Sequence, residues 1–140
     1  MRNNHELTTL LNRALWNDFY RTRNEWFDKH LIFTKRQLLT HVLNNCRPHY
    51  YVTFDYAARQ ASRLIRSKRS GRRLSVKQQM WYEIASKVAR LMLMGRARSI
   101  SEALTEVLVS SRASRYFLSY SQARRIINEE SRRHSARRRC

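Results

Sequence analysis

Side chains suited to reading nucleic acid gather in two segments of the chain, residues 53–66 and 119–133. Arginine, glutamine and asparagine are the residues that pair with guanine and adenine edges in the major groove of DNA. In both segments they occupy the polar side of a helix whose other side is apolar. The candidate contacts are Tyr56, Arg59, Gln60, Arg63 and Arg66 in the first segment, and Gln122, Arg124, Arg125, Asn128, Arg132 and Arg133 in the second.

Two further stretches are basic but have no apolar periodicity. Residues 67–74 form a predicted linker, and residues 131–140 form a tail that we expect to be disordered without a partner. Such arms typically contact backbone phosphates and carry little sequence information. Their candidate contacts are Lys68, Arg69, Arg72 and Arg73 in the linker, and Arg137, Arg138 and Arg139 in the tail.

The net charge points to the same class of partner. Lysine and arginine number 29 against 10 acidic residues, a formal charge of +19. A chain this basic repels itself, and a polyanion relieves that repulsion. We expect binding to duplex DNA, as a transcriptional regulator or a nucleoid architectural protein. RNA binding or ribosome association remains an alternative. A protein–protein adaptor, or a phage structural component close to a genome, is a second.

Catalytic and metal chemistry finds little support in the sequence. The carboxylates are scattered, and two glycines are too few for a glycine-rich phosphate loop. Cys46 and His49 have a spacing that zinc sites use, but zinc wants four ligands, and Arg112 and Arg115 occupy the matching positions later in the chain. We therefore expect no enzyme activity, no metal, no cofactor and no small-molecule substrate.

The chain resembles itself at a shift of about 65 residues. Trp16 falls on Trp81, and residues 39–43 fall on residues 104–108. With one inserted residue, residues 49–54 fall on residues 115–120. This collinear series predicts a tandem duplication, with one unit over residues 1–66 and another over residues 75–130.

Each unit is predicted to contain three helices, which makes the fold all-α. The second helix of each opens on a capping-box pattern, Thr34 with Gln37 and Ser99 with Glu102. The third helices open at Thr53 and Ser119, and Gly95 is a natural stop for the first helix of the second unit. A short capped helix followed by an arginine-rich helix resembles a helix-turn-helix in outline.

The remaining aromatic residues are predicted to belong to the core. Tyr50 and Tyr51, and likewise Tyr116 and Phe117, recur beside a helix start, although base stacking is an alternative role. Trp16 and Trp81 are interpreted as core anchors, and Trp26 as packed. The absence of a signal peptide, of a membrane-spanning apolar run and of a disulfide framework predicts a cytoplasmic protein, associated with the nucleoid if the source is bacterial.

Overall fold

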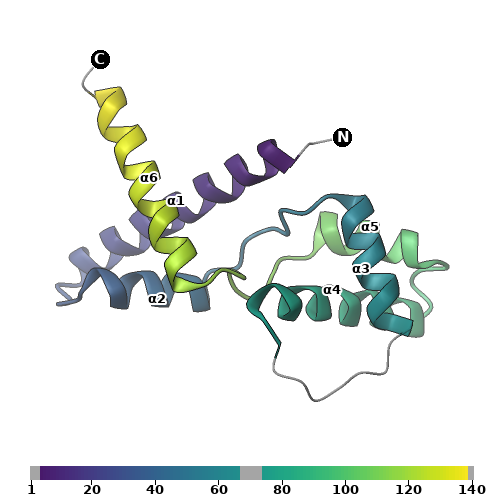
Figure 1. Cartoon of the computed structure of the whole chain (residues 1–140). Helices are drawn as coiled ribbons and strands as arrows, with labels where there is room; N and C mark the ends of the chain where they lie inside the picture. The colour runs from purple at the N-terminus through teal and green to yellow at the C-terminus, as the bar shows by residue number, and fades with distance from the viewer. Residues whose placement is uncertain (1–3, 67–73, 139–140) are drawn as a thin grey trace. The chain divides into compact units, whose positions relative to one another are not determined.

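The computed structural model describes residues 4–66 and 74–138. These residues form helices and no strand, which confirms the all-α class (Figure 1). The helices are α1 (Asn4–Asp28), α2 (Lys35–Asn45), α3 (Phe54–Arg66), α4 (Val76–Leu93), α5 (Ile100–Ser110) and α6 (Tyr120–Arg138).

The helices group into two compact units. The inner unit, His49–Ala113, contains α3, α4 and α5, and the outer unit, His5–Pro48 with the residues from Ser114 onward, contains α1, α2 and α6 (Figure 1). This grouping differs from the predicted division into residues 1–66 and 75–130. The outer unit takes α1 and α2 from the first predicted half and α6 from the second. The inner unit takes α4 and α5 from the second half and α3 from the first.

Hydrogen bonds at the helix starts explain where these helices begin. Thr34 forms the predicted capping box with Gln37, and Ser75 forms another with Gln78. At Ser99 only one hydrogen bond of the predicted capping box is found, in which the Ser99 hydroxyl accepts from the Glu102 backbone N–H at 3.1 Å. Each hydroxyl satisfies a backbone donor that has no partner within its helix.

The third helices are capped where the sequence predicted. The Thr53 hydroxyl accepts from the backbone N–H of Tyr56 at 3.4 Å. Ser119 and Gln122 exchange hydrogen bonds at 3.2 and 3.0 Å, a reciprocal cap that the sequence analysis did not anticipate.

The ends of α1 and α4 are also alike. His30 has φ of 58° and Gly95 has φ of +71°, and both follow the last helical turn. The backbone N–H of Leu31 donates to the Trp26 carbonyl at 3.0 Å, and that of Arg96 donates to the Leu91 carbonyl at 3.0 Å. This is the hydrogen bond of a Schellman motif, so the predicted stop at Gly95 is confirmed and His30 takes the same left-handed conformation.

Each unit has its own apolar core. In the outer unit the buried residues are Leu15 and Phe19 of α1, Leu38, Leu39, Val42 and Leu43 of α2, Tyr116, and Ala123, Ile126 and Ile127 of α6. In the inner unit they include Ala57 and Ala61 of α3, Trp81, Ile84 and Val88 of α4, and Ala103, Leu104 and Val107 of α5. The predicted apolar sides of α3 and α6 therefore face these cores, except that Ile65 near the end of α3 is 38% exposed.

In each unit a buried tyrosine donates a hydrogen bond to a carboxylate, which lies on α1 in the outer unit and on α4 in the inner unit. Tyr116 is 1% exposed, and its hydroxyl donates to the Asp18 carboxylate at 2.6 Å in the outer unit. Tyr50 is 6% exposed, and its hydroxyl donates to Glu83 in the inner unit. The prediction that these two tyrosines fill the core is confirmed, and each satisfies its polar end with a carboxylate.

The predicted disordered tail is wrong over most of its length, because α6 continues through Arg138. Glu130 pairs with Arg133 at 3.3 Å and with His134 at 3.7 Å, which supports consecutive turns of the helix. The His134 ring also stacks on Trp16 of α1 at 4.6 Å, a contact that local sequence does not reveal. The predicted linker, apart from Leu74, lies outside the described residues.

No helix among the described residues combines the length and the apolar character needed to cross a membrane.

Candidate nucleic-acid interface

The polar side of α6 carries a row of candidate contacts. Arg124, Arg125 and Arg132 are exposed, whereas Ala123, Ile126 and Ile127 of the same helix are buried. With 3.6 residues per turn, Arg124, Arg125, Asn128 and Arg132 fall on the side opposite these buried residues. We call these four residues the α6 arginine stripe. It runs for roughly 12 Å along the helix axis.

Gln122 and Arg133 of α6 form contacts inside the outer unit, and so does Asn128 of the stripe. Gln122 completes the cap with Ser119, and Arg133 pairs with Glu130. The Asn128 side-chain oxygen accepts a hydrogen bond from the Lys35 ammonium group at 2.9 Å. That bond brings a cation from α2 to the stripe, so it increases the positive charge there.

The outer side of α3 carries the second group. Tyr56 is 43% exposed and packs edge-on against Trp81 at 5.4 Å. The Arg59 guanidinium lies 5.6 Å from the centre of the Tyr56 ring, and Arg63 is exposed one turn later. The structure therefore brings Tyr56, Arg59 and Arg63 to one solvent-facing side, while Gln60 is half-buried.

Other candidate contacts lie at the ends of helices or outside the described residues. Arg66 closes α3, and Arg137 and Arg138 lie in the last turn of α6. The candidates outside the described residues are Lys68, Arg69, Arg72, Arg73 and Arg139.

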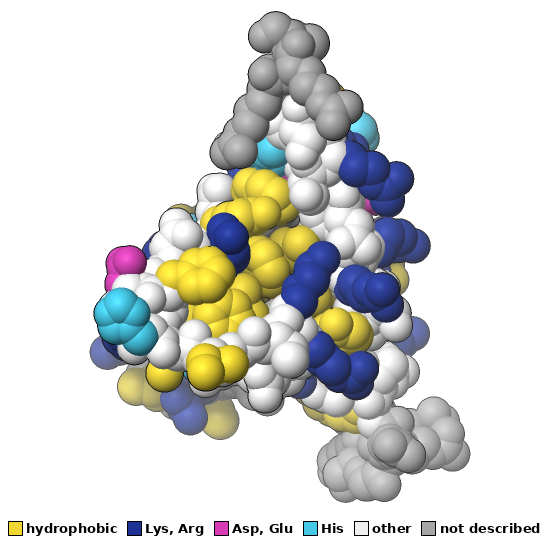
Figure 2. Space-filling model, turned by 90° about the vertical axis from the view of Figure 1, so that its left-hand side faces the viewer, with side chains coloured by type: hydrophobic (Ala, Val, Ile, Leu, Met, Phe, Trp, Pro, Cys, Tyr) yellow, Lys and Arg dark blue, Asp and Glu magenta, His cyan; other side chains and the backbone are white. Residues whose placement is uncertain are grey.

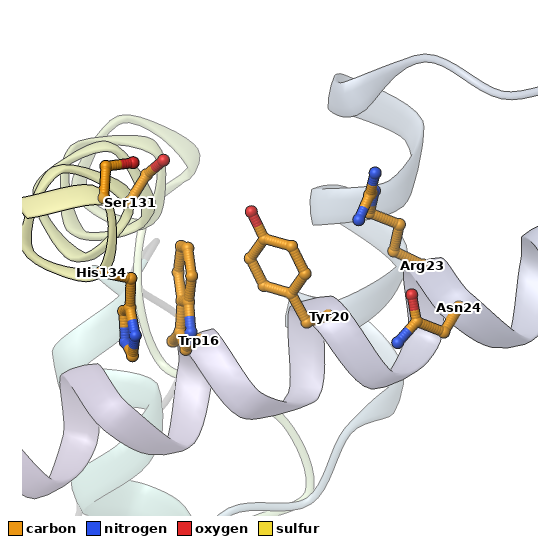
Figure 3. A pocket seen from close by; sticks show the side chains of 7 residues that line it. Trp16, Tyr20, Arg23, Asn24, Ser131 and His134 are labelled. Atoms are coloured by element: carbon orange, nitrogen blue, oxygen red, sulfur yellow. The ribbon is translucent and has the colours of Figure 1, made fainter. Parts of the chain in front are cut away.

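The structure adds a feature that the sequence analysis missed, a cavity of about 520 Å³ between α1 and α6 of the outer unit (Figure 3). We call it the aromatic groove. Trp16 is sandwiched there, with His134 stacked at 4.6 Å and Tyr20 tilted at 4.2 Å. The side chains that line it are Trp16, Tyr20, Arg23 and Asn24 of α1 and Ser131, His134 and Ser135 of α6.

Arg23 continues the row of rings along α1. Its guanidinium lies 5.3 Å from the centre of the Tyr20 ring and 4.8 Å from that of Phe27. Figure 3 shows Trp16, Tyr20 and Arg23 following one another along the helix.

Figure 2 shows one face of the molecule on which hydrophobic side chains gather with lysines and arginines beside them.

The prediction for Trp16 as a core anchor therefore needs extension. Trp16 packs against the outer core but is only half-buried and lines the groove, whereas Trp81 is 5% exposed, as predicted. A signal for the groove was present in the repeat. Where the first half has Tyr20 and Arg23, the second half has Ala85 and Val88, and both of these are buried.

Within the described part of the chain, the Cys46 thiol packs against the outer core. Burial raises the pKa of Cys46, and the nearby Asp18 carboxylate raises it further. A raised pKa keeps the thiol protonated, which lowers its reactivity as a nucleophile or metal ligand.

Comparison of the chain with protein-family models, with curated proteins and with solved structures finds no match.

Proposed function

We propose that this protein binds duplex DNA through the arginine-rich outer sides of α6 and α3. The observation that carries the proposal is the α6 arginine stripe. Its three arginines are exposed, and none of them forms an ion pair among the described residues. An exposed arginine without a carboxylate partner can give all its donors to phosphates or base edges.

The stripe has the dimensions that the major groove requires. An α-helix fits into that groove, and its solvent-facing residues over two to three turns reach the base edges. Arginine pairs in bidentate fashion with guanine, and asparagine with adenine. With a net charge of +19, release of counterions from the DNA supplies the sequence-independent part of the affinity.

We further infer that the chain is a tandem duplication whose third helices have been exchanged between the units. A residue in the left-handed conformation follows both α1 and α4, namely His30 and Gly95. The same tyrosine–carboxylate bond joins Tyr116 to Asp18 and Tyr50 to Glu83. The two tyrosines match each other in the repeat, and so do the two carboxylates. Each tyrosine donates its hydrogen bond to the carboxylate of the other half of the sequence.

The exchange also changes what the helix-turn-helix resemblance means. In the outer unit the second helix, α2, packs with α6, and in the inner unit α5 packs with α3. The helix pair that presents each arginine-rich side is therefore built from helices that are not consecutive in the chain.

The test is a titration of a labelled random-sequence duplex, followed by fluorescence anisotropy at several salt concentrations. We expect the affinity to fall steeply with salt, with a log–log slope of magnitude about 5–9. Replacing Arg124, Arg125 and Arg132 together by alanine should weaken binding by at least about tenfold and flatten the slope by about 3.

A matched control removes the same charge elsewhere. Arg90, Arg96 and Arg98 are exposed residues of the inner unit, and their triple alanine variant has the same net charge as the stripe variant. Equal losses in both variants would show that only the total charge matters and would contradict the role of the stripe. A slope close to zero would refute the electrostatic basis itself.

The nature of the nucleic acid is decided by competition. If structured RNA displaces the duplex efficiently at fixed salt, the target is RNA and not duplex DNA. Selection from random duplexes then separates a regulator, which enriches a motif, from an architectural protein, which does not.

A further inference from the structure

We propose that the aromatic groove of the outer unit binds an unpaired base of a nucleic acid held on the α6 arginine stripe. This inference rests on the proposed function and adds a second kind of contact to it. The protein would then prefer DNA that contains an unpaired or extruded nucleotide over a fully paired duplex.

The rings of the groove favour a planar ligand. The Trp16 and Tyr20 rings contact each other, with their centroids 4.2 Å apart and their planes inclined at 50°, so a base would lie against the ring surfaces that line the cavity and not between the two rings. The cavity of about 520 Å³ lies within the range of pockets that take small ligands. Every nucleobase has a π-face that stacks on aromatic side chains, so such a site accepts bases of any sequence.

The polar groups of the groove fit a nucleotide better than an uncharged aromatic compound. Arg23 supplies a cation, and Asn24 and Ser131 supply donors and acceptors for a base edge. No carboxylate is among the described side chains that line the groove, and Glu130, which contacts the groove residue His134, also pairs with Arg133. Unpaired bases are recognised by this combination of stacking, guanidinium contact and edge hydrogen bonding.

The groove adjoins the stripe on α6. Ser135 is three residues after Arg132, and Ser131 is three residues after Asn128, so each serine neighbours a stripe residue on the helix surface. A strand whose phosphates lie on the stripe therefore has its bases next to the mouth of the groove. This adjacency is why we assign the groove to nucleic acid rather than to a free small molecule.

Trp16 and Tyr20 pack against the outer core without belonging to its buried cluster, and Arg23 lies outside that cluster. The inner unit has buried Ala85 and Val88 at the positions that match Tyr20 and Arg23, and it forms a core without large rings there. Arg23 is half-buried and lies over two rings rather than against a carboxylate. Cation–π geometry of this kind leaves the guanidinium donors at the edge of the arginine plane free to turn towards a phosphate.

The experiment compares two labelled duplexes that differ only by a single extra thymidine, which forms a one-nucleotide bulge in one of them. We expect wild-type protein to bind the bulged duplex about tenfold more tightly, the order expected for stacking of one base. Tyr20→Leu should abolish this preference and leave the affinity for the paired duplex unchanged. Tyr20→Phe keeps the ring and should keep the preference.

Circular dichroism melting checks that the variants fold. If Tyr20→Leu is unfolded, Arg23→Ala replaces it, since Arg23 is not part of the apolar core, and the same loss of preference is expected. Equal binding of both duplexes by wild-type protein, or a preference that survives in the folded variant, would overturn the groove assignment while the proposed function stands. Failure to bind either duplex would overturn both.

Discussion

The hydrogen bond from Tyr116 to Asp18 offers a direct test of which third helix belongs to which unit. The perturbation is Tyr116→Phe, which removes only the hydroxyl group. That hydroxyl lies 2.6 Å from the Asp18 carboxylate, within a residue that is 1% exposed. Hydrogen bonds to charged groups contribute about 1.5–3 kcal/mol to stability.

We expect a value near the lower end of that range. Asp18 keeps a salt bridge to Arg21 at 2.8 Å, and its side chain is 18% exposed, so water and the guanidinium compensate part of the loss. The free energy of unfolding should therefore fall by about 1.5 kcal/mol. With a urea dependence of about 2 kcal/mol/M, the unfolding midpoint should move by about 0.75 M.

A double-mutant cycle isolates the pair. We expect Tyr116→Phe and Asp18→Asn to show a coupling energy of about 1 kcal/mol, since they share one hydrogen bond. Tyr50→Phe and Glu83→Gln should show a similar coupling in the inner unit. The crossed cycles, Tyr116 with Glu83 and Tyr50 with Asp18, should show coupling near zero. Coupling confined to the crossed pairs would refute the exchange and would favour units at residues 1–66 and 75–130.

Two further measurements test local features of the structure. His30→Gly should raise the free energy of unfolding by about 1 kcal/mol, because His30 has φ of 58° and is exposed, and a destabilised variant in urea titration would contradict this. Gly95→Ala should lower it by about 1 kcal/mol through the same strain alone, since an added Cβ meets nothing within 4 Å. The raised pKa of Cys46 predicts that stability declines as the pH rises above about 9, because the unfolded thiol ionises while the buried thiol stays protonated. Cys46→Ser should weaken this decline, and an unchanged pH profile would show that other groups cause it.

Much of the local structure could be predicted because it depends on residues only a few positions apart. Thr34, Thr53, Ser99 and Ser119 begin helices where the sequence placed them, and Gly95 ends one. The candidate arginines of α6 lie on its exposed side for the same reason, since helical periodicity alone separates them from the buried residues.

The errors arose where distant residues decide the outcome. The absence of an apolar pattern predicts a disordered end of the chain, yet α6 continues through Arg138 and its His134 stacks on Trp16. The aromatic groove was missed because its two walls come from opposite ends of the chain. Neither contact leaves a periodic signal in the sequence.

The all-α class, the starts of the second and third helices of each half and most of the sides that they bury follow from the sequence, because capping and periodicity act within one or two turns. Long-range contacts set the packing of α6 with α1 and α2, and of α3 with α4 and α5. The helix pairs α1–α2 and α4–α5 present similar apolar sides to a third helix. Local sequence pattern therefore cannot tell whether α3 or α6 packs against a given pair. Long-range packing, including the choice of carboxylate by each buried tyrosine, makes that distinction.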